Sequence, residues 1–232
     1  MRLEEAKRDY YRRRAKEEGY RSRAAFKLKQ LNNKYQLMRR GSKVVDIGAA
    51  PGGWTQVSSE LVGNVGQVIG IDLEPIKAVS KNTIILLEDI TSSTVVESIT
   101  NALRGNKADL VLADLSPKLS GVWDMDHYKQ IDLCNSAIDL LPPILKNGGS
   151  SVMKAFDGDE FQGLVKRLKQ SFERVEISKP SASRKESSEM YLVGLDFTGQ
   201  VPKRHSEVYQ SLHPSGGHLD SALSDWHENP AT

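Results

Sequence analysis

Short apolar runs alternate with amphipathic stretches of helical spacing along the chain, from about residue 43 to residue 198. The apolar runs predict strands at 43–48, 67–72, 83–88, 108–114, 150–156, 173–178 and 190–197. The stretches between them predict helices at 53–62, 91–103, 126–141 and 159–171, with a short one near 75–80. This alternation is typical of one doubly wound α/β domain, with helices on both faces of a mostly parallel sheet.

Individual strands refine this prediction. The runs Val-Val-Asp-Ile at 44–47 and Asp-Leu-Val-Leu-Ala-Asp at 109–114 carry apolar residues on both faces. Parallel strands covered by helices on both sides have this composition. The last two predicted strands follow each other with no helix between them, so we expect an antiparallel hairpin at the end of the sheet.

The two ends of the chain differ from this pattern. Residues 1–40 predict a basic helical arm, with one helix from about residue 3 to 18 and a second one with Ser22 as its N-cap. The α/β domain is expected at 41–198, and the polar residues 199–232 are expected to form a flexible tail. Four of the five histidines lie in this tail, at 205, 213, 218 and 227. Their spacings match no usual metal-ligand pattern, so no metal is expected.

Charge is distributed unevenly along the chain. The formal net charge is only +2, but residues 1–43 hold 15 Lys and Arg against 5 Asp and Glu. The arm therefore carries +10 and the remainder −8. Tyr10, Tyr11, Tyr20 and Phe26 are interleaved with the basic residues. A basic arm with aromatic residues predicts contact with a polyanion, most simply a nucleic acid.

Length and composition exclude several classes of protein. The chain has 232 residues, and no apolar run approaches the ~20 residues of a membrane span. No secretory signal is apparent at the charged N-terminus. Cys134 is the only cysteine, which excludes a disulfide framework. We therefore expect a cytoplasmic protein with no membrane partner.

A glycine-rich turn joins the first predicted strand of the sheet to the helix that follows it. The segment Asp46-Ile-Gly-Ala-Ala-Pro-Gly-Gly-Trp54 places this turn where open α/β sheets bind nucleotide-like ligands. The dinucleotide fingerprint G-x-G-x-x-G is absent, and Pro51 has no backbone N–H to offer a pyrophosphate. S-adenosylmethionine, which carries an adenosine and a sulfonium but no phosphate, fits such a loop.

Charged residues stand at the ends of four further predicted strands. They are Asp72, Asp89, Asp114 and Lys154. In a parallel sheet these ends converge on one crevice. Asp72 can accept hydrogen bonds from ribose hydroxyls, and Asp89 can accept one from an adenine amino group. Lys154 is flanked by apolar residues, so it needs a partner, and Asp114 on the adjoining strand is the natural one.

Five motifs, in order, give the chain a specific resemblance. They are the runs Arg-Ser-Arg-Ala-Ala-Phe-Lys-Leu at 21–28, Asp-Ile-Gly-Ala-Ala-Pro-Gly-Gly-Trp at 46–54, Leu-Ala-Asp-Leu-Ser-Pro at 112–117, Val-Met-Lys-Ala-Phe at 152–156 and Ala-Ser-Arg-Lys-Glu-Ser-Ser-Glu-Met-Tyr at 182–191. The chain resembles the FtsJ/RlmE family of S-adenosylmethionine-dependent RNA 2′-O-ribose methyltransferases. The resemblance spans about residues 20–197.

The resemblance implies a fold, a reaction and a site. The fold is a Rossmann-like class I methyltransferase with strand order 3-2-1-4-5-7-6 and an antiparallel seventh strand. The reaction is methyl transfer from S-adenosylmethionine, without a metal, to a ribose 2′-hydroxyl, most simply of a uridine in large-subunit (23S-type) ribosomal RNA. The implied catalytic residues are Lys27, Asp114, Lys154 and Glu189, and the implied cofactor contacts are Gly52, Trp54, Asp72, Asp89 and Asp114. The expected partner is ribosomal RNA within the large subunit, bound by a monomer.

Other functions stay open on the sequence. The implied catalytic residues act on the ribose and do not distinguish the RNA around it. Therefore 2′-O-methylation of transfer RNA or of an mRNA cap is an alternative. A non-catalytic RNA-binding protein would not need the lysine and carboxylate set. An NAD-dependent oxidoreductase is disfavoured by the missing fingerprint. Methylation of a base usually relies on an Asn/Asp-Pro-Pro-aromatic loop or a catalytic cysteine, and neither is apparent.

Overall fold

A computed structural model describes residues 3–184 and 186–204 of the protein. Contacts between residues divide the chain into two units, Met1–Val201 and Pro202–Thr232, and the fold discussed here is that of the first. The four tail histidines lie outside the described residues, so the prediction of a flexible tail stays a prediction. The predicted division at residues 40 and 198 also stays a prediction.

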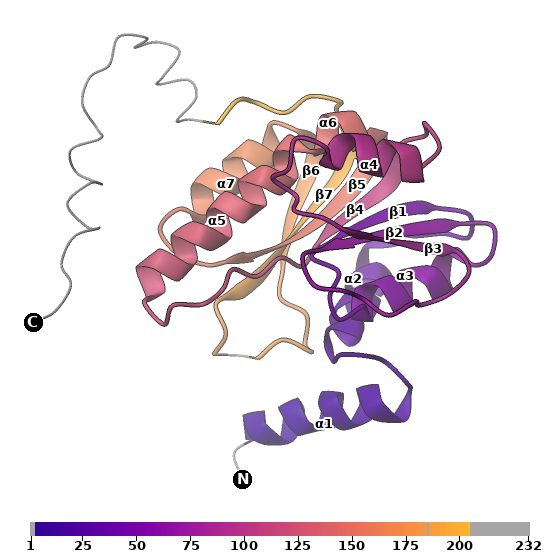
Figure 1. Ribbon diagram of the computed structural model, residues 1–232. Helices are drawn as coiled ribbons and strands as arrows, with labels where there is room; N and C mark the ends of the chain where they lie inside the picture. Colours follow the sequence, from indigo (N-terminus) through magenta and orange to yellow (C-terminus); the bar gives the residue numbers. More distant parts are fainter. Residues whose placement is uncertain (1–2, 185, 205–232) are drawn as a thin grey trace, which may run out of the picture. The chain divides into compact units, whose positions relative to one another are not determined.

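Seven strands form one sheet within the described residues, in the order β3-β2-β1-β4-β5-β7-β6 (Figure 1). They are β1 (Lys43–Ile47), β2 (Gln67–Asp72), β3 (Thr83–Leu87), β4 (Ala108–Ala113), β5 (Leu145–Phe156), β6 (Phe172–Ser178) and β7 (Glu189–Phe197). Neighbouring strands are parallel except at β7, which runs antiparallel to both β5 and β6. The predicted order and the terminal hairpin are confirmed.

Helices cover both faces of this sheet. The helices of the described residues are α1 (Leu3–Glu17), which packs on α2, and α2 (Ala24–Tyr35), α3 (Gly53–Val62), α4 (Val95–Ala102), α5 (Trp123–Asp139), α6 (Leu141–Ile144) and α7 (Phe161–Lys169). In Figure 1, α2 and α3 lie below the sheet, whereas α4, α5 and α7 lie above it. The predicted doubly wound architecture is therefore confirmed.

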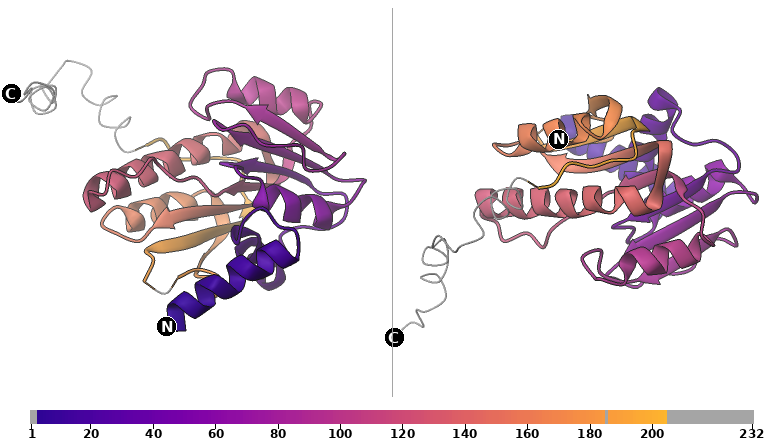
Figure 2. Two further views of the ribbon diagram at one scale, coloured as in Figure 1. Left: turned by 60° about the horizontal axis from the view of Figure 1, so that its bottom comes forward. Right: turned by 90° about the horizontal axis from the view of Figure 1, so that it is seen from above.

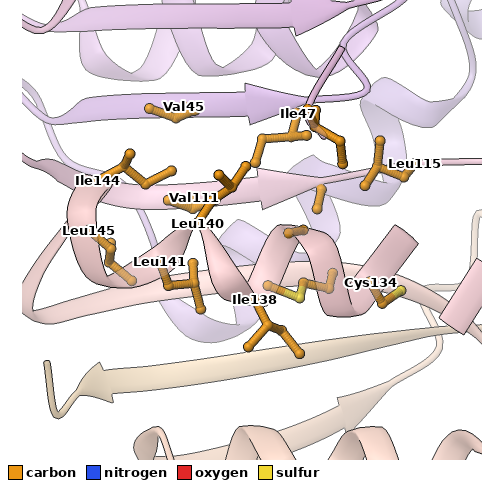
Figure 3. Close-up of a cluster of buried hydrophobic side chains, with 14 of the residues drawn as sticks. Val45, Ile47, Val111, Leu115, Cys134, Ile138, Leu140, Leu141, Ile144 and Leu145 are labelled. Carbon is orange, nitrogen blue, oxygen red and sulfur yellow. The ribbon is translucent and has the colours of Figure 1, made fainter. Parts of the chain in front are cut away.

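Alternate residues of the central strands point into two cores. Val44 packs with Leu28 of α2 and Val57 of α3, whereas Val45 packs on the opposite face with Ile138 of α5. Figure 3 shows the larger of the two cores, in which β1 and β4 meet α5 and α6. Because both faces are covered, the functional side chains can gather only along the ends of the strands.

Helix α1 lies against the rest of the first unit through a small aromatic cluster. Ala15 packs with Phe26 of α2 and with Ala182 in the loop between β6 and β7. The Tyr11 hydroxyl lies 3.3 Å from the Ser181 hydroxyl. The basic arm and this loop therefore lie side by side, as Figure 2 shows.

Two details of the sequence prediction are wrong. No helix forms at 75–80, because Arg21 takes the backbone carbonyl oxygens of Lys77 and Ala78, at 2.8 and 2.7 Å. Ser22 does not cap α2, since Arg23 occupies the N-cap position, and no side chain accepts a capping hydrogen bond there. The Ser22 hydroxyl instead packs so closely on Gly53 that a β-carbon there would lie 2.3 Å from it.

Several boundaries also differ, and the strand predicted from residue 150 begins earlier, at Leu145. The helix predicted at 126–141 begins earlier, at Trp123, and ends at Asp139, with Pro142 and Pro143 following in the short α6. The helix predicted from residue 91 begins only at Val95. Within the described part of the chain, no helix is both long enough and apolar enough to cross a membrane.

Candidate active site

Lys154 and Asp114 meet where β4 and β5 end. The register of these strands pairs Ala113 with Met153. The residues that follow them, Asp114 and Lys154, therefore lie side by side. The Lys154 Nζ lies 3.2 Å from the Asp114 Oδ1 and donates to the Asp114 backbone oxygen at 3.2 Å. The Lys154 residue is only 6% exposed. The buried amine therefore has the partner that the strand ends indicated, since an unpaired ammonium would be costly here.

Lys27 and Glu189 form a second ion pair beside the first. Lys27 extends from α2, and its Nζ lies 2.7 Å from Oε2 of Glu189, the first residue of β7. Strand pairing sets Glu189 opposite Phe156, two residues beyond Lys154. Burial acts to raise the pKa of Glu189, but the charge and hydrogen bond of Lys27 lower it below its ordinary value. The structure thus holds Glu189 as a carboxylate.

Tyr191 lies between these pairs, and the sequence assigned it no role. It is fully buried and opposite Lys154 in the register. The Lys27 Nζ lies 5.5 Å from the centre of its ring. Burial raises the pKa of its hydroxyl well above the usual value, and the charge of Asp114 adds to this. The buried phenol therefore stays neutral beside the Asp114 carboxylate.

A cavity of about 550 Å³ opens at the ends of β1, β2 and β4. It is lined by six carboxylate residues and two lysines, together with apolar and backbone groups. The charged residues are Asp72, Glu74, Glu88, Asp89, Asp114, Asp132, Lys118 and Lys129. Three of the predicted cofactor contacts, Asp72, Asp89 and Asp114, are therefore brought together here. An acidic lining favours a cationic ligand over one that carries phosphates.

The glycine-rich turn uses its own amides inside the protein. Gly48 and Ala49 donate to the Ile71 oxygen at 2.9 and 3.1 Å, Ala50 donates to the Asp72 Oδ2 at 2.8 Å, and Gly52 donates to the Ala49 oxygen at 2.6 Å. Pro51 has no amide to donate. The backbone of the turn is therefore not arranged to wrap a pyrophosphate, which such loops bind through free N–H groups.

Two of the aspartates that line the cavity, Asp72 and Asp89, are held by neighbouring backbone and hydroxyl groups. Asp72 accepts from the amides of Ala50 and Glu74, at 2.8 and 2.9 Å. Asp89 accepts from the amide and the hydroxyl of Thr91, both at 2.8 Å. The backbone hydrogen bond from Thr91 lowers the pKa of Asp89. Each carboxylate keeps lone pairs for a further donor, as the predicted contacts with ribose and adenine require.

Gly52 and Trp54 are not among the residues that line this cavity. Gly52, the N-cap residue of α3, has a φ of 106°, and a β-carbon there would lie 2.6 Å from the Arg21 side chain. Trp54 is buried, donates to the Ala24 oxygen at 2.8 Å and packs on Tyr191. Both residues shape the turn and its support, and their predicted contact with a cofactor stays a prediction.

Comparisons with known proteins show the family of the chain. The family model described as FtsJ-like methyltransferase matches residues 20–197. The chain belongs to the FtsJ-like methyltransferase family. It is 44% identical over 216 residues to the ribosomal RNA large subunit methyltransferase E of Methanothrix thermoacetophila, covering 93% of this chain and 83% of that protein.

Solved structures show the same fold. A Plasmodium falciparum protein assigned as a ribosomal RNA methyltransferase is 29% identical, with a TM-score of 0.69 over 78% of this chain and 100% of that one. The fibrillarin of Aeropyrum pernix, crystallised with natively bound S-adenosyl-L-methionine, has a TM-score of 0.53 and 15% identity. It covers 76% of this chain and 75% of its own, and it supports the fold alone.

One further acidic residue of this FtsJ-like methyltransferase was not singled out from the sequence. Asp46 on β1 is fully buried, and its Oδ2 accepts a 2.7 Å hydrogen bond from the Thr55 hydroxyl. Burial raises the pKa of Asp46 to about 7, and the charges of Asp114 and Asp72 add to the shift. A carboxylate inside an otherwise apolar strand was the available signal.

We expect Asp46 to make the stability of the fold depend on pH. The pKa of Asp46 is raised in the folded state, so its neutral carboxyl group stabilises the fold relative to the ionised one. This contribution to the free energy of unfolding is fully present below the unfolded pKa near 4 and is lost as pH rises through about 7. Asp46→Asn, which keeps an acceptor for Thr55, should lack this loss. The free energy of unfolding of the variant minus that of the unmodified protein should therefore increase by about 2–4 kcal/mol from pH 4.5 to pH 8.5. Urea denaturation at both pH values measures this, and parallel pH curves would refute it.

A basic groove lies between the arm and the loop that joins β6 to β7. Its volume is about 580 Å³, and its charged residues are Arg12, Lys16, Arg21, Arg23 and Arg184. Lys27, of the candidate active site, follows Arg23 on the same stretch of chain. This FtsJ-like methyltransferase thus has a cluster of positive charge, the basic groove, next to the candidate active site. The cavity at the ends of β1, β2 and β4 is, by contrast, acidic.

Proposed function

We propose that the protein transfers the methyl group of S-adenosylmethionine to a ribose 2′-hydroxyl of RNA, with large-subunit ribosomal RNA as the substrate. The observation that carries the proposal is the position of Asp114. Its carboxylate lines the acidic cavity and also lies 3.2 Å from the buried Lys154 amine. One residue therefore links a site for a cationic ligand to a buried base.

The cavity fits the proposed methyl donor. S-adenosylmethionine carries a sulfonium, which the carboxylate-rich lining would favour. Asp72 would hold the ribose hydroxyls and Asp89 the adenine amino group. The related fold of fibrillarin holds the same donor. The donor supplies an electrophilic methyl carbon when bound.

The residues of the protein would then activate and orient the hydroxyl. A 2′-hydroxyl is a poor nucleophile, so the proton must leave as its oxygen bonds to the methyl carbon. Lys154 is the proposed acceptor of that proton at Nζ, and it must first lose its own proton to solvent, because only the neutral amine has a lone pair to accept one. The electrons of the broken carbon–sulfur bond remain on sulfur. Asp114 orients the amine, and Lys27, fixed by Glu189, positions the ribose. Alignment of the two reactants contributes several kcal/mol.

The relatives favour ribosomal RNA over transfer RNA. The curated relatives bear the name ribosomal RNA large subunit methyltransferase E, at 40–45% identity. A non-catalytic binding protein is disfavoured because two buried ion pairs at one site would serve it no purpose. An NAD-dependent oxidoreductase is disfavoured by the occupied amides of the turn.

Radiolabelled methyl transfer tests the proposal. The protein is incubated with labelled S-adenosylmethionine and, separately, with transfer RNA, naked ribosomal RNA and large ribosomal subunits. We expect label on one ribose 2′-oxygen of the large-subunit RNA. Label on a base would overturn the reaction proposed here, and label on transfer RNA alone would overturn the substrate.

The basic groove predicts a difference between two neighbouring arginines. Arg12 lines the groove, whereas Arg13 lies outside it and is 3.6 Å from Glu17. Arg12→Glu should weaken RNA binding roughly tenfold at low salt and reduce the salt slope of log Kd by about one or more. Arg13→Glu makes the same charge change and serves as the matched control. If both variants keep the unmodified slope in a salt titration, the groove does not hold phosphates.

A further inference from the structure

An exposed aromatic side chain stands beside the candidate active site and has no role in the reaction described above. Trp123, the first residue of α5, is 48% exposed. Its ring stacks on His127, with centroids 5.8 Å apart and an angle of 20°, and on Phe156, at 6.0 Å and 28°. Two near-parallel neighbours hold the indole in one orientation although half of the residue faces water.

A pocket of about 450 Å³ lies against this indole. Its apolar residues are Leu119, Trp123 and Phe156, and its polar residues are Asp126, Arg184, Glu186, Ser187, Ser188 and Glu189. We call it the aromatic pocket. Among the described residues of its lining, three carboxylates stand against one basic side chain, which favours a flat, uncharged group with polar edges over a phosphate.

The aromatic pocket connects the two sites described so far. Phe156 lies two residues beyond Lys154 on β5 and pairs with Glu189 across the strands. Glu189 holds Lys27 of the candidate active site. Arg184 lines both the aromatic pocket and the basic groove. An RNA chain with its phosphates in the groove would therefore pass the aromatic pocket as it approaches the buried amine.

We propose that the aromatic pocket holds one nucleobase of the RNA substrate, stacked on Trp123, while Arg184 contacts the adjoining phosphate. The proposal rests on the function proposed above and extends it to how the ribose is presented. Proteins that read single-stranded RNA splay bases out and stack them on aromatic rings. A base fixed here would hold the adjoining ribose near the end of β5 and the start of β7, where the two ion pairs lie.

Fluorescence titration tests the stacking directly. The probes are a single-stranded uridine decamer and the same decamer made of abasic ribose phosphates. We expect the uridine decamer to quench indole emission in the unmodified protein, and we expect that quenching to be lost in Trp123→Phe. Trp54 and Trp226 are present in both proteins, so the difference between the two titrations isolates the Trp123 signal.

Binding constants from filter retention give a second readout that needs no turnover. Trp123→Ala should weaken binding of the uridine decamer roughly tenfold while changing binding of the abasic decamer less than twofold. Trp123→Phe should restore most of the loss. Tyr128→Ala is the matched control, since Tyr128 is a more exposed aromatic on the same helix that does not line the aromatic pocket.

The outcomes separate this proposal from the proposed function. If Trp123→Ala loses the same factor on both decamers, or none on either, the pocket does not hold a base and instead suits a protein partner. The proposed function would stand in that case, provided that methyl transfer to ribose is observed. Preference for the uridine decamer without any 2′-O-methylation would support the base pocket and overturn the function.

Discussion

Lys154→Ala should reduce methyl transfer at least a thousandfold and leave the dissociation constant of S-adenosylmethionine within about twofold of the unmodified value. The reason is that the amine lies on Asp114 and does not line the acidic cavity. Removing it takes away the proposed proton acceptor but none of the residues around the donor. Single-turnover rates and calorimetry measure the two quantities separately.

The same strand supplies a matched control. Lys146, also on β5, forms an ion pair with Asp109 at the opposite end of the strands. Lys146→Ala removes the same side chain from the same strand and should retain near-normal turnover. Lys154→Arg should stay inactive, because a guanidinium keeps its charge and cannot accept a proton. Near-normal turnover by Lys154→Ala would remove Lys154 as the base.

Asp72→Ala should weaken binding of S-adenosylmethionine by about 10- to 100-fold, with little effect on RNA binding. The two ribose hydroxyls of S-adenosylmethionine would lose their charged hydrogen-bond acceptor, the Asp72 carboxylate at the end of β2. The same carboxylate also holds the amides of Ala50 and Glu74. Loss of those bonds would loosen the turn at the cavity and act in the same direction. Isothermal calorimetry with the donor measures the affinity.

Asp109→Ala controls for the loss of a carboxylate that supports backbone. Asp109 accepts a 2.6 Å hydrogen bond from the Lys43 amide and, by its place on β4, lies away from the acidic cavity. Its removal should lower stability but leave the affinity of the donor unchanged. A donor affinity unaltered in Asp72→Ala would refute the assignment of Asp72 to the ribose.

The sequence anticipated the sheet because period and composition are local signals. Doubly apolar runs such as Val44–Ile47 identify parallel strands, and parallel strands bring their ends to one edge. The positions of Asp72, Asp89, Asp114 and Lys154 followed from that geometry alone. The pairing of Lys154 with Asp114 could be predicted because adjacent strands leave one amine and one carboxylate side by side.

Features set by distant contacts could not be predicted in this way. Residues 75–80 have helical spacing, but Arg21, more than fifty residues earlier, takes their carbonyl oxygens. Ser22 is a good capping residue, yet Gly53 offers its hydroxyl a tight packing site. The local sequence signals for a helix start and for a short helix are weak, and such tertiary contacts override them.

The roles of aromatic residues were missed for the same reason. Tyr191 lies in an apolar strand and reads as core, and only the positions of Lys27 and Asp114 give its hydroxyl a polar setting. Trp123 reads as the start of a helix, and its stacking on Phe156 joins α5 to β5. Neither contact has a signature in the spacing of residues along the chain.

A crystal structure with S-adenosylmethionine bound would test the central claim most directly. Reacting atoms lie about 3–3.5 Å apart in a productive complex, and the accepting amine lies one hydrogen bond beyond the hydroxyl. We therefore predict the donor methyl within ~6 Å of the Lys154 Nζ, facing the ends of β4 and β5. A donor methyl group directed away from Lys154, together with a Lys154 Nζ that points into bulk solvent, would contradict the account.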